Sequence, residues 1–247
     1  MMSYAPVLYW KVGNMVGGVE TEVRLLPALC DRDALAVDIG GNFGMYTTFM
    51  AAHAKECVVF EPLPHLASVL VRGFRGRNVR VEDVALSNGE GRATLRMPRY
   101  EMGHSTIEPQ NAVDTHIKIP DTIETMTVEK RTLDSYALQP VAFLKIDVEG
   151  HEPEVLEGSE QTIRAGLPAI LIELENRHRT GVVDHVFARL TQRGYSGFVF
   201  HDAHLIPVTG LHPVVRNYLF LHASKRERIR QALTQRGIFV NGQGRCV

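Results

Sequence analysis

Residues 37–44, which read VDIGGNFG, combine an acid with three glycines at a spacing that suits a ligand-binding turn. Asp38 lies at the end of an apolar run, and Gly40 and Gly44 precede a helical stretch. Glycine is favoured where φ is positive or where a ligand presses against the backbone. In an open α/β sheet, the turn after the first strand is a position where ligands bind. The segment therefore predicts a binding site.

Two kinds of ligand use such a turn, and the residue types distinguish them. A dinucleotide site needs G-x-G-x-x-G, so that a pyrophosphate can lie at the helix N-terminus. Counting from Gly40, the second required glycine falls on Asn42, and this pattern fails. The pattern D-x-G-x-x-x-G instead places Asp38 before the turn, where an anion disfavours pyrophosphate and suits the ammonium and sulfonium of S-adenosylmethionine. We therefore expect Asp38, Gly40, Asn42 and Gly44 to contact that cofactor.

The second and third predicted strands also end near acids. Glu61 follows the second apolar run, and its carboxylate can accept hydrogen bonds from both hydroxyls of a ribose. Both kinds of ligand contain ribose, so Glu61 does not discriminate between them. Asp83 follows the third run and can accept from an adenine amino group, while Val84 packs on the ring. A helix cap or a surface charge is the alternative role for each acid.

A group of charged residues near the fourth and fifth predicted strands could act on the acceptor, the molecule that receives the methyl group of the cofactor. Lys145, Asp147 and Glu149 alternate along the sequence, as do Glu173 and Glu175, so each set is expected to share one face of its strand. Burying such charges costs several kcal/mol unless they are paired or functional. Carboxylates of Asp147 and Glu173 would then converge on one crevice, where we expect Asp147 to contact the cofactor as well. They could take a proton, grip a polyhydroxylated acceptor, or bind a divalent ion with a histidine; an ion pair with Lys145 is the alternative.

The sequence offers several general bases for an acceptor hydroxyl. His151 directly precedes a predicted helix, whose dipole disfavours the imidazolium and so keeps the ring in the form that accepts a proton. Asp147 and Glu173 are the next candidates, and His104 in a polar loop is a further one. A positioned base typically contributes roughly 10²–10⁴-fold to such a reaction. No metal ion is predicted, although a divalent ion is one of the uses that the acids allow.

Apolar runs that alternate with amphipathic stretches predict the elements that must position these residues. Strands alternating with helices indicate an α/β fold with a parallel sheet covered on both faces. We expect an N-terminal extension at 1–34 with a helix over 19–30, a main domain at 35–222, a hairpin and loop inserted at 84–130, and a helix and tail at 223–247. The expected strands are 35–39, 57–60, 79–81, 141–148, 169–174, 197–200 and 216–221, and the expected helices are 45–54, 64–75, one from 153, and 182–193.

Composition excludes several other classes of protein. The 247 residues are 45% hydrophobic and 22% charged, which is typical of a globular chain rather than a disordered, collagenous or coiled-coil one. The longest apolar stretches are far too short to span a bilayer. The net charge of −1 gives no field that would attract nucleic acid or an anionic membrane. Three widely spaced cysteines and the lack of a basic, apolar leader favour a reducing compartment, and we expect the cytoplasm.

An aromatic group near the N-terminus has three interpretations. Tyr4, Tyr9 and Trp10 could cover the site as a lid, seal a homodimer, or pack on the core. Core packing is the plainest of these roles.

Several segments resemble the FkbM-type methyltransferases, a class I family that uses S-adenosylmethionine. The matching segments are VDIGGNFG at 37–44, FEP at 60–62, VALS at 84–87, LKIDVEGHE at 144–152, ILIELE at 170–175 and NYLFL at 217–221. The resemblance implies a Rossmann-like three-layer sandwich whose seven-stranded, mostly parallel sheet has an antiparallel last strand. It also implies methyl transfer to a hydroxyl, and a loop containing His104 that approaches the cofactor or the acceptor.

The resulting expectation is an S-adenosylmethionine-dependent O-methyltransferase that acts on a small molecule, such as a sugar, a polyketide or another secondary metabolite. An NAD(P)-dependent oxidoreductase or epimerase is the first alternative, and Asn42 and the lack of a Tyr-x-x-x-Lys pair disfavour it. A non-catalytic ligand-binding module of the same fold is the second. Nucleic-acid methylation is disfavoured because the chain has no Asn-Pro-Pro-Tyr segment and no basic stripe.

Calorimetric titration separates these alternatives. We expect S-adenosylhomocysteine to bind. NAD and NADP should not bind, because the turn lacks the glycine pattern that holds a pyrophosphate and an acid precedes it. Glu61→Ala should lose the S-adenosylhomocysteine affinity, since the ribose hydroxyls lose their acceptor. Retained affinity in that variant would refute the ribose assignment.

Overall fold

The structure, a computed structural model, describes residues 6–15, 18–98, 105–108, 123–177 and 179–241. Two residues singled out from the sequence, Tyr4 and His104, lie outside these ranges. Within them, no helix is both long enough and apolar enough to cross a bilayer.

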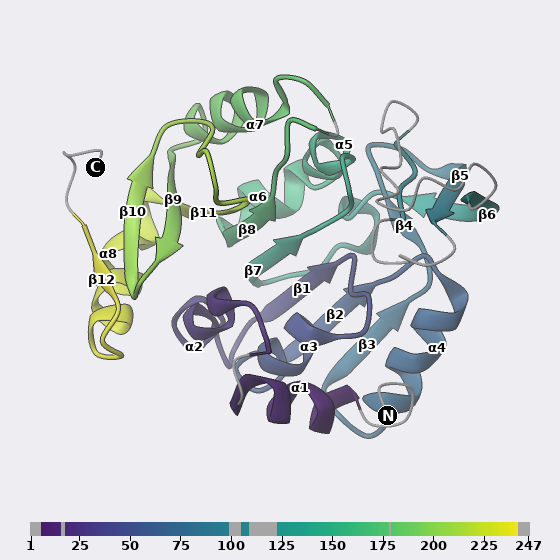
Figure 1. The fold of residues 1–247 in the computed structure, drawn as a ribbon, viewed down its shortest axis with the longest axis horizontal. Helices are drawn as coiled ribbons and strands as arrows, with labels where there is room; N and C mark the ends of the chain where they lie inside the picture. Colours follow the sequence, from purple (N-terminus) through teal and green to yellow (C-terminus); the bar gives the residue numbers. More distant parts are fainter. Residues whose placement is uncertain (1–5, 16–17, 99–104, 109–122, 178, 242–247) are drawn as a thin grey trace.

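A mixed sheet forms the centre of the molecule (Figure 1). Parallel pairing joins five consecutive strands that begin at one edge of the sheet, and the strand that follows them is antiparallel to both of its neighbours. In spatial order the strands are β3 (Val79–Glu82), β2 (Glu56–Phe60), β1 (Leu35–Ile39), β7 (Val141–Ile146), β8 (Ala169–Glu173), β11 (Asn217–His222), β9 (Tyr195–His201), β10 (His204–Val208) and β12 (Phe239–Val240). The predicted α/β class with a mostly parallel sheet is thus confirmed.

The sheet has nine strands rather than the predicted seven. β10 pairs antiparallel with β9 and β12 pairs parallel with β10, so both extend the sheet at one edge. The turn between β9 and β10 consists of Asp202 and Ala203, which have positive φ values of 45° and 63°. Glycine or asparagine usually marks such a hairpin turn, and neither is present here, which is why the sequence pattern missed β10.

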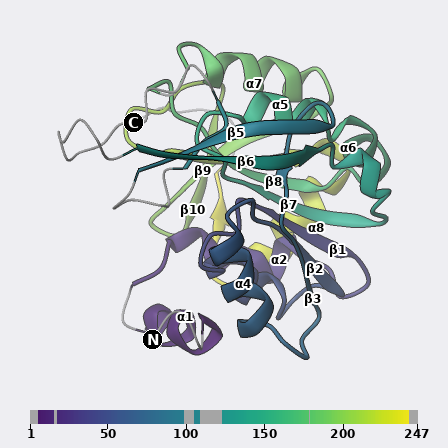
Figure 2. The same ribbon diagram turned by 90° about the vertical axis from the view of Figure 1, so that its right-hand side faces the viewer.

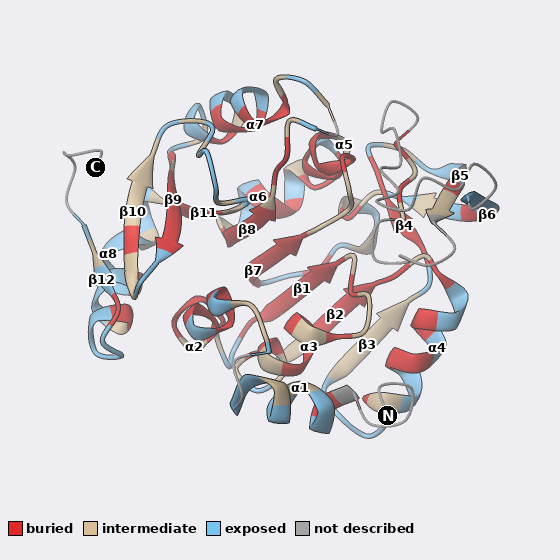
Figure 3. Ribbon diagram, viewed as in Figure 1, coloured by how far each residue is buried: buried red, intermediate tan, exposed pale blue. Residues whose placement is uncertain are grey.

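Helices cover both faces of the sheet, and alternate residues of each strand supply the two apolar layers. On β1, Val37 and Ile39 join the layer against the helices at 152–157, 160–166 and 182–191, while Ala36 joins the layer against those at 26–29, 45–50 and 223–234. The central strands are buried along their length, whereas the outer faces of the helices are exposed (Figure 3). The helices are α1 (Pro6–Met15), α2 (Leu26–Leu29), α3 (Met45–Met50), α4 (Pro64–Gly73), α5 (Glu152–Glu157), α6 (Glu160–Gly166), α7 (Val182–Thr191) and α8 (Ala223–Thr234).

Two regions differ from the expected helices. In place of one helix over 19–30, a short 3-10 helix, η1 (Thr21–Leu25), leads directly into α2, and α1 precedes both. The single helix expected from residue 153 is divided into α5 and α6, with Gly158 between them. Gly158 allows α5 to approach the backbone at Ser87, because a Cβ at this glycine would lie 2.0 Å from the Ser87 carbonyl oxygen.

The segment between β3 and β7 forms a second sheet of three strands beside the carboxyl edge of the first. Its order is β4 (Ala85–Leu86), β6 (Ile123–Arg131) and β5 (Gly91–Pro98), and β5 and β6 run side by side as a long antiparallel ribbon (Figure 2). The described piece 105–108 pairs with β5 through a bridge between Arg96 and Thr106. Leu95 and Val128 of this sheet pack against Leu63 and Leu66 near the start of α4, which fixes the sheet over the main domain.

The tight approach at Gly158 predicts a strong effect of a single methyl group. Gly158→Ala should lower the free energy of unfolding by roughly 1–3 kcal/mol or more, because the new Cβ overlaps a backbone oxygen that cannot rotate away. Gly89→Ala is the matched control, since a Cβ at Gly89 would have no heavy atom within 4 Å. Chemical denaturation measures both variants, and equal stability of the two would contradict the packing argument.

Candidate active site

A cavity of about 270 Å³ lies at the carboxyl ends of the central strands, between the main sheet and the second sheet. Four carboxylate side chains line it, together with the glycine turn and an apolar wall. The acids are Glu61, Asp147, Glu149 and Glu173. A smaller cavity of about 160 Å³ adjoins it and shares Gly40, Asn42 and Asp147 with it. The two cavities therefore meet at the glycine turn that the sequence predicts as a binding site.

Close backbone packing explains the glycines of this turn. Gly40 has a φ of +84°, and a Cβ there would lie 1.9 Å from the carbonyl oxygen of Asp147. Gly44 precedes α3 with a φ of +78°, and a Cβ there would lie 2.8 Å from Leu70. Asn42 between them lines both cavities, and its buried Oδ1 atom accepts no hydrogen bond from the described residues. That oxygen is available to a ligand.

Glu61 connects two loops that border the larger cavity. Its Oε2 atom accepts a hydrogen bond from the backbone N–H of Asn42 (2.8 Å), and its Oε1 atom accepts one from Leu63 (2.9 Å). Burial raises the pKa of Glu61 to about 7, although these two hydrogen bonds oppose the shift. Each carboxylate oxygen has a second lone pair, so the side chain can hold the loops and still accept from a ribose hydroxyl. Glu61 can therefore hold the two loops together and bind a ribose at the same time.

Asp38 faces the smaller cavity from the end of β1 and is 2% exposed. Thr47 of α3 donates a hydrogen bond to it at 2.5 Å. Burial raises the pKa of Asp38 to about 6, with the Thr47 hydrogen bond and the nearby Lys145 ammonium acting in the opposite direction. Asp38 thus fixes the start of α3 at the same place where an ammonium group of a ligand would find an acceptor.

The two residues predicted at the adenine are placed differently. Val84 lines the larger cavity, as do Ala85 and Leu86 after it. Asp83 is exposed and does not belong to the lining of that cavity. The structure therefore supplies the apolar contact for a ring, but the Asp83 carboxylate is not directed to the same space.

Asp147 and Lys145 form the ion pair that the sequence left open as an alternative. Lys145 is 1% exposed, and its Nζ atom lies 3.3 Å from Oδ2 of Asp147 and 4.9 Å from the centre of the Tyr46 ring. Burial would lower the pKa of Lys145, but Asp147 and the more distant carboxylates outweigh it and raise that pKa. Asp147 nevertheless borders both cavities with 30% of its side chain exposed. It is paired and accessible at the same time.

Glu173 lines the larger cavity together with Asp147, as the strand order predicts. Burial raises the pKa of Glu173, and the negative charge of Asp147 raises it further. Glu173 therefore holds a proton more readily than an ordinary glutamate does.

The expected alternation fails beyond these residues because the strands end earlier than predicted. β7 ends at Ile146, and Glu149 has a φ of 54° in the loop that follows. β8 ends at Glu173, and Glu175 turns to Arg177, whose Nε atom lies 2.6 Å from Oε2 of Glu175. Glu175 is thus part of an ion pair and does not share the face of Glu173.

His151 is buried, and both of its ring nitrogens face side chains. Nδ1 lies 3.2 Å from Oε2 of Glu108, and Nε2 lies 3.0 Å from Oγ of Ser87. The ring borders the larger cavity, but a proton from an acceptor would have to displace one of these partners. The geometry therefore favours Asp147 over His151 as the base, in contrast to the order inferred from the sequence.

The N-terminal segment adds two residues to the site, and one of them, Glu20, was not identified from the sequence. Trp10 of α1 lines the smaller cavity and donates from Nε1 to the Phe43 carbonyl oxygen at 2.9 Å. Glu20 lines the same cavity and accepts from the Tyr46 hydroxyl at 2.7 Å. No local pattern signals either role, since both depend on how the N-terminal segment returns to the sheet. Among the interpretations of the aromatic group, cover over the glycine turn fits Trp10.

Comparison with known proteins relates these features to one family. The FkbM methyltransferase domain matches residues 38–196. The protein named Methyltransferase 1 from Beauveria bassiana (strain ARSEF 2860) is 30% identical over 161 residues, which cover 58% of this chain and 65% of that protein. The chain thus spans slightly less than two thirds of this relative.

A solved structure shares the fold. The crystal structure of methyltransferase FkbM from Methylobacillus flagellatus KT has a TM-score of 0.53 and 15% sequence identity to this chain. The similarity covers 78% of this chain and 44% of the other. At this level of identity the likeness concerns the arrangement of the elements.

The raised pKa of Glu61 predicts how ligand affinity depends on pH. Ribose hydroxyls donate best to the carboxylate form, so binding of S-adenosylhomocysteine requires loss of the proton that Glu61 carries below a pH of about 7. The affinity should be constant above that pH and should fall as the pH decreases, by up to about tenfold per pH unit. Calorimetry at a series of pH values measures this dependence.

Glu61→Gln is the control for this dependence because it cannot ionise and keeps the shape of the side chain. The step near pH 7 should disappear in the variant, which leaves only the weaker dependence from Asp38 near pH 6. The same slope in both proteins, or tighter binding in acid, would contradict the assignment to Glu61.

Proposed function

The chain belongs to the FkbM methyltransferase family, and on this premise we propose that it transfers a methyl group from S-adenosylmethionine to a hydroxyl group of a small molecule. The observation that carries the proposal is the convergence of Glu61, Asp147 and Glu173 on one cavity beside the glycine turn. When bound, the cofactor supplies an electrophilic methyl group on a sulfonium. The protein has to bind it, orient the acceptor and remove one proton.

The residues around the turn suit this cofactor. Glu61 is the acceptor for the ribose hydroxyls, and Val84 lies in the wall where the adenine would pack. Asp38 and the unpartnered Oδ1 of Asn42 are acceptors for an ammonium group. Gly40 lines both cavities, and because it has no side chain its backbone can pack closely against the carbonyl oxygen of Asp147. A cation is favoured over a phosphate among so many carboxylates.

Asp147 is the proposed general base. It lies where the two cavities meet, so it can contact an acceptor beside a cofactor that extends from one cavity into the other. The ion pair with Lys145 at 3.3 Å holds the Asp147 carboxylate in position. Glu173, which retains its proton more readily, can donate a hydrogen bond to the acceptor oxygen and so orient it.

The charge of the lining favours a neutral, hydroxyl-rich acceptor. Four carboxylates line the larger cavity, and within the described part of the chain its lining includes no lysine or arginine. Phosphate groups of a nucleic acid or a sugar phosphate would be repelled there, whereas sugar or polyketide hydroxyls can donate to the acids. A sugar, a polyketide or a related secondary metabolite is therefore the proposed acceptor class.

Methyl transfer from labelled S-adenosylmethionine to a panel of neutral glycosides and polyketide alcohols tests the proposal. Asp147→Asn should lower kcat by roughly 10²–10⁴-fold, because the variant cannot take the hydroxyl proton. Glu157→Gln, an exposed acid on α5, is the control and should keep the original rate.

Affinity for S-adenosylhomocysteine, measured on the same samples, confirms that each variant is folded. Full turnover by Asp147→Asn would remove Asp147 from the reaction. Cofactor binding without transfer to any hydroxyl would favour the non-catalytic ligand-binding module instead.

A further inference from the structure

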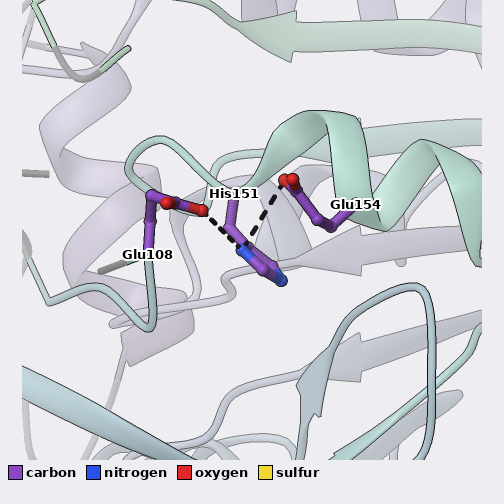
Figure 4. A group of neighbouring side chains, drawn as sticks. All are labelled: Glu108, His151 and Glu154. Carbon is purple, nitrogen blue, oxygen red and sulfur yellow. Dashed lines mark hydrogen bonds and ion pairs between the residues drawn. The ribbon is translucent and has the colours of Figure 1, made fainter. Parts of the chain in front are cut away.

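Glu108, His151 and Glu154 bring three metal-binding side chains together at the wall of the larger cavity. Their nearest ligand atoms all lie within 4.8 Å of one another. Nδ1 of His151 is 3.2 Å from Oε2 of Glu108 and 3.7 Å from Oε2 of Glu154, so the ring nitrogen lies between two carboxylates (Figure 4). Glu108 and His151 are buried, and Glu154 is half-buried.

Neighbours hold the other side-chain polar atoms of His151 and Glu154, and the backbone of Glu108, in place. Ser87 lies 3.0 Å from Nε2 of His151, and its hydroxyl can accept the Nε2 proton. Arg179 donates to Oε1 of Glu154 at 2.8 Å. The backbone N–H of Glu108 donates to Oγ1 of Thr106 at 3.0 Å. Such outer contacts are typical of protein metal sites, where they fix the tautomer of a ligating histidine.

A single proton on Nδ1 of His151 cannot give both carboxylate oxygens a hydrogen bond. A proton on Nδ1 can be donated to Oε2 of Glu108, but the buried Oε2 atom of Glu154 then still accepts no hydrogen bond from the described residues. A buried polar atom without a partner costs about 1–3 kcal/mol. A cation between the three atoms would accept a lone pair from each of them, including the Oε2 atom of Glu154.

We propose that Glu108, His151 and Glu154 bind one divalent first-row transition-metal ion, such as Mn²⁺ or Zn²⁺. An imidazole with two carboxylates suits these ions better than Mg²⁺ or Ca²⁺, which prefer oxygen ligands throughout. Metal–ligand distances of about 2.0–2.2 Å require the three atoms to close by roughly half an ångström. Three protein ligands leave at least one further coordination position for water or another ligand.

The proposed ion would join the inserted segment to the main domain. Glu108 comes from the piece 105–108 that pairs with β5, while His151 and Glu154 come from the loop after β7 and from α5. Ser105 and Ile107 of the same piece line the larger cavity. The ion would therefore fix one wall of that cavity, whichever acceptor the protein uses.

Binding of the metal itself tests the proposal without any measurement of activity. The full chain is first freed of metal with a chelator and dialysed, and Mn²⁺ is then titrated while the electron paramagnetic resonance signal of the free ion is recorded. We expect one Mn²⁺ bound per chain, displaced by Zn²⁺ and not by equimolar Mg²⁺. Either metal should raise the melting temperature in a concentration-dependent way. No loss of the free-ion signal at millimolar protein would overturn the proposal.

Variants distinguish metal binding by these three side chains from nonspecific binding of the ion to other acidic residues. Glu108→Gln and Glu154→Gln should each weaken binding on the order of 100-fold, and Ser87→Ala should weaken it by about 10–100-fold through the orientation of His151. Glu157→Gln, on the same helix as Glu154, should bind as the unmodified protein does. Equal affinity in the two ligand variants and in this control would overturn the assignment. If a ligand variant does not fold, the Ser87→Ala comparison and the titration of the unmodified chain still decide the result.

Discussion

A single buried carboxylate holds together the two loops on which the site depends. Glu61 accepts the backbone N–H groups of Asn42 and Leu63, so the loops after β1 and β2 keep a fixed separation at the edge of the sheet. Because the group is buried, its charge is costly unless hydrogen bonds compensate it. Stability of the loops and readiness for a ligand are thus properties of one side chain, and neither can change without the other.

The arrangement of charges around Lys145 extends this principle to the neighbouring strands. Asp38 on β1 lies beside Lys145 on β7 in the strand register, and Asp147 follows directly after the end of β7. One buried ammonium thus moderates the repulsion among several acids that point to one space. An acidic pocket can persist at this edge because Lys145 lines only the smaller of the two cavities, which leaves the lining of the larger one to the carboxylates.

The sequence predicted the parts of the fold and of the site that depend on local pattern. Continuous apolar runs located the seven strands of the common core, and the spacing around Gly40 located the turn. The ends of strands were less predictable, because alternation of Glu173 and Glu175 cannot reveal that β8 stops and that Arg177 captures the second acid. β10 was missed because its turn lacks glycine.

Contacts between distant segments set a stricter limit on prediction. Glu108 and His151 are 43 positions apart in the chain, and only the fold of the second sheet brings them together. The preference for His151 as a base followed from its place before a helix, and no local pattern could show that Ser87 and Glu108 occupy its ring nitrogens. Residues 105–108 thus affect the site through tertiary contacts that cannot be predicted from their own sequence.

Trp10 gives the glycine turn an optical consequence. It is the only tryptophan of the chain, and its indole N–H is hydrogen-bonded to the carbonyl oxygen of Phe43 within the turn. Indole emission responds to the polarity and hydrogen bonding around the ring, so the intrinsic tryptophan fluorescence of this protein originates from one position beside the smaller cavity. Occupancy of the turn is therefore coupled to a spectroscopic signal that needs no added label.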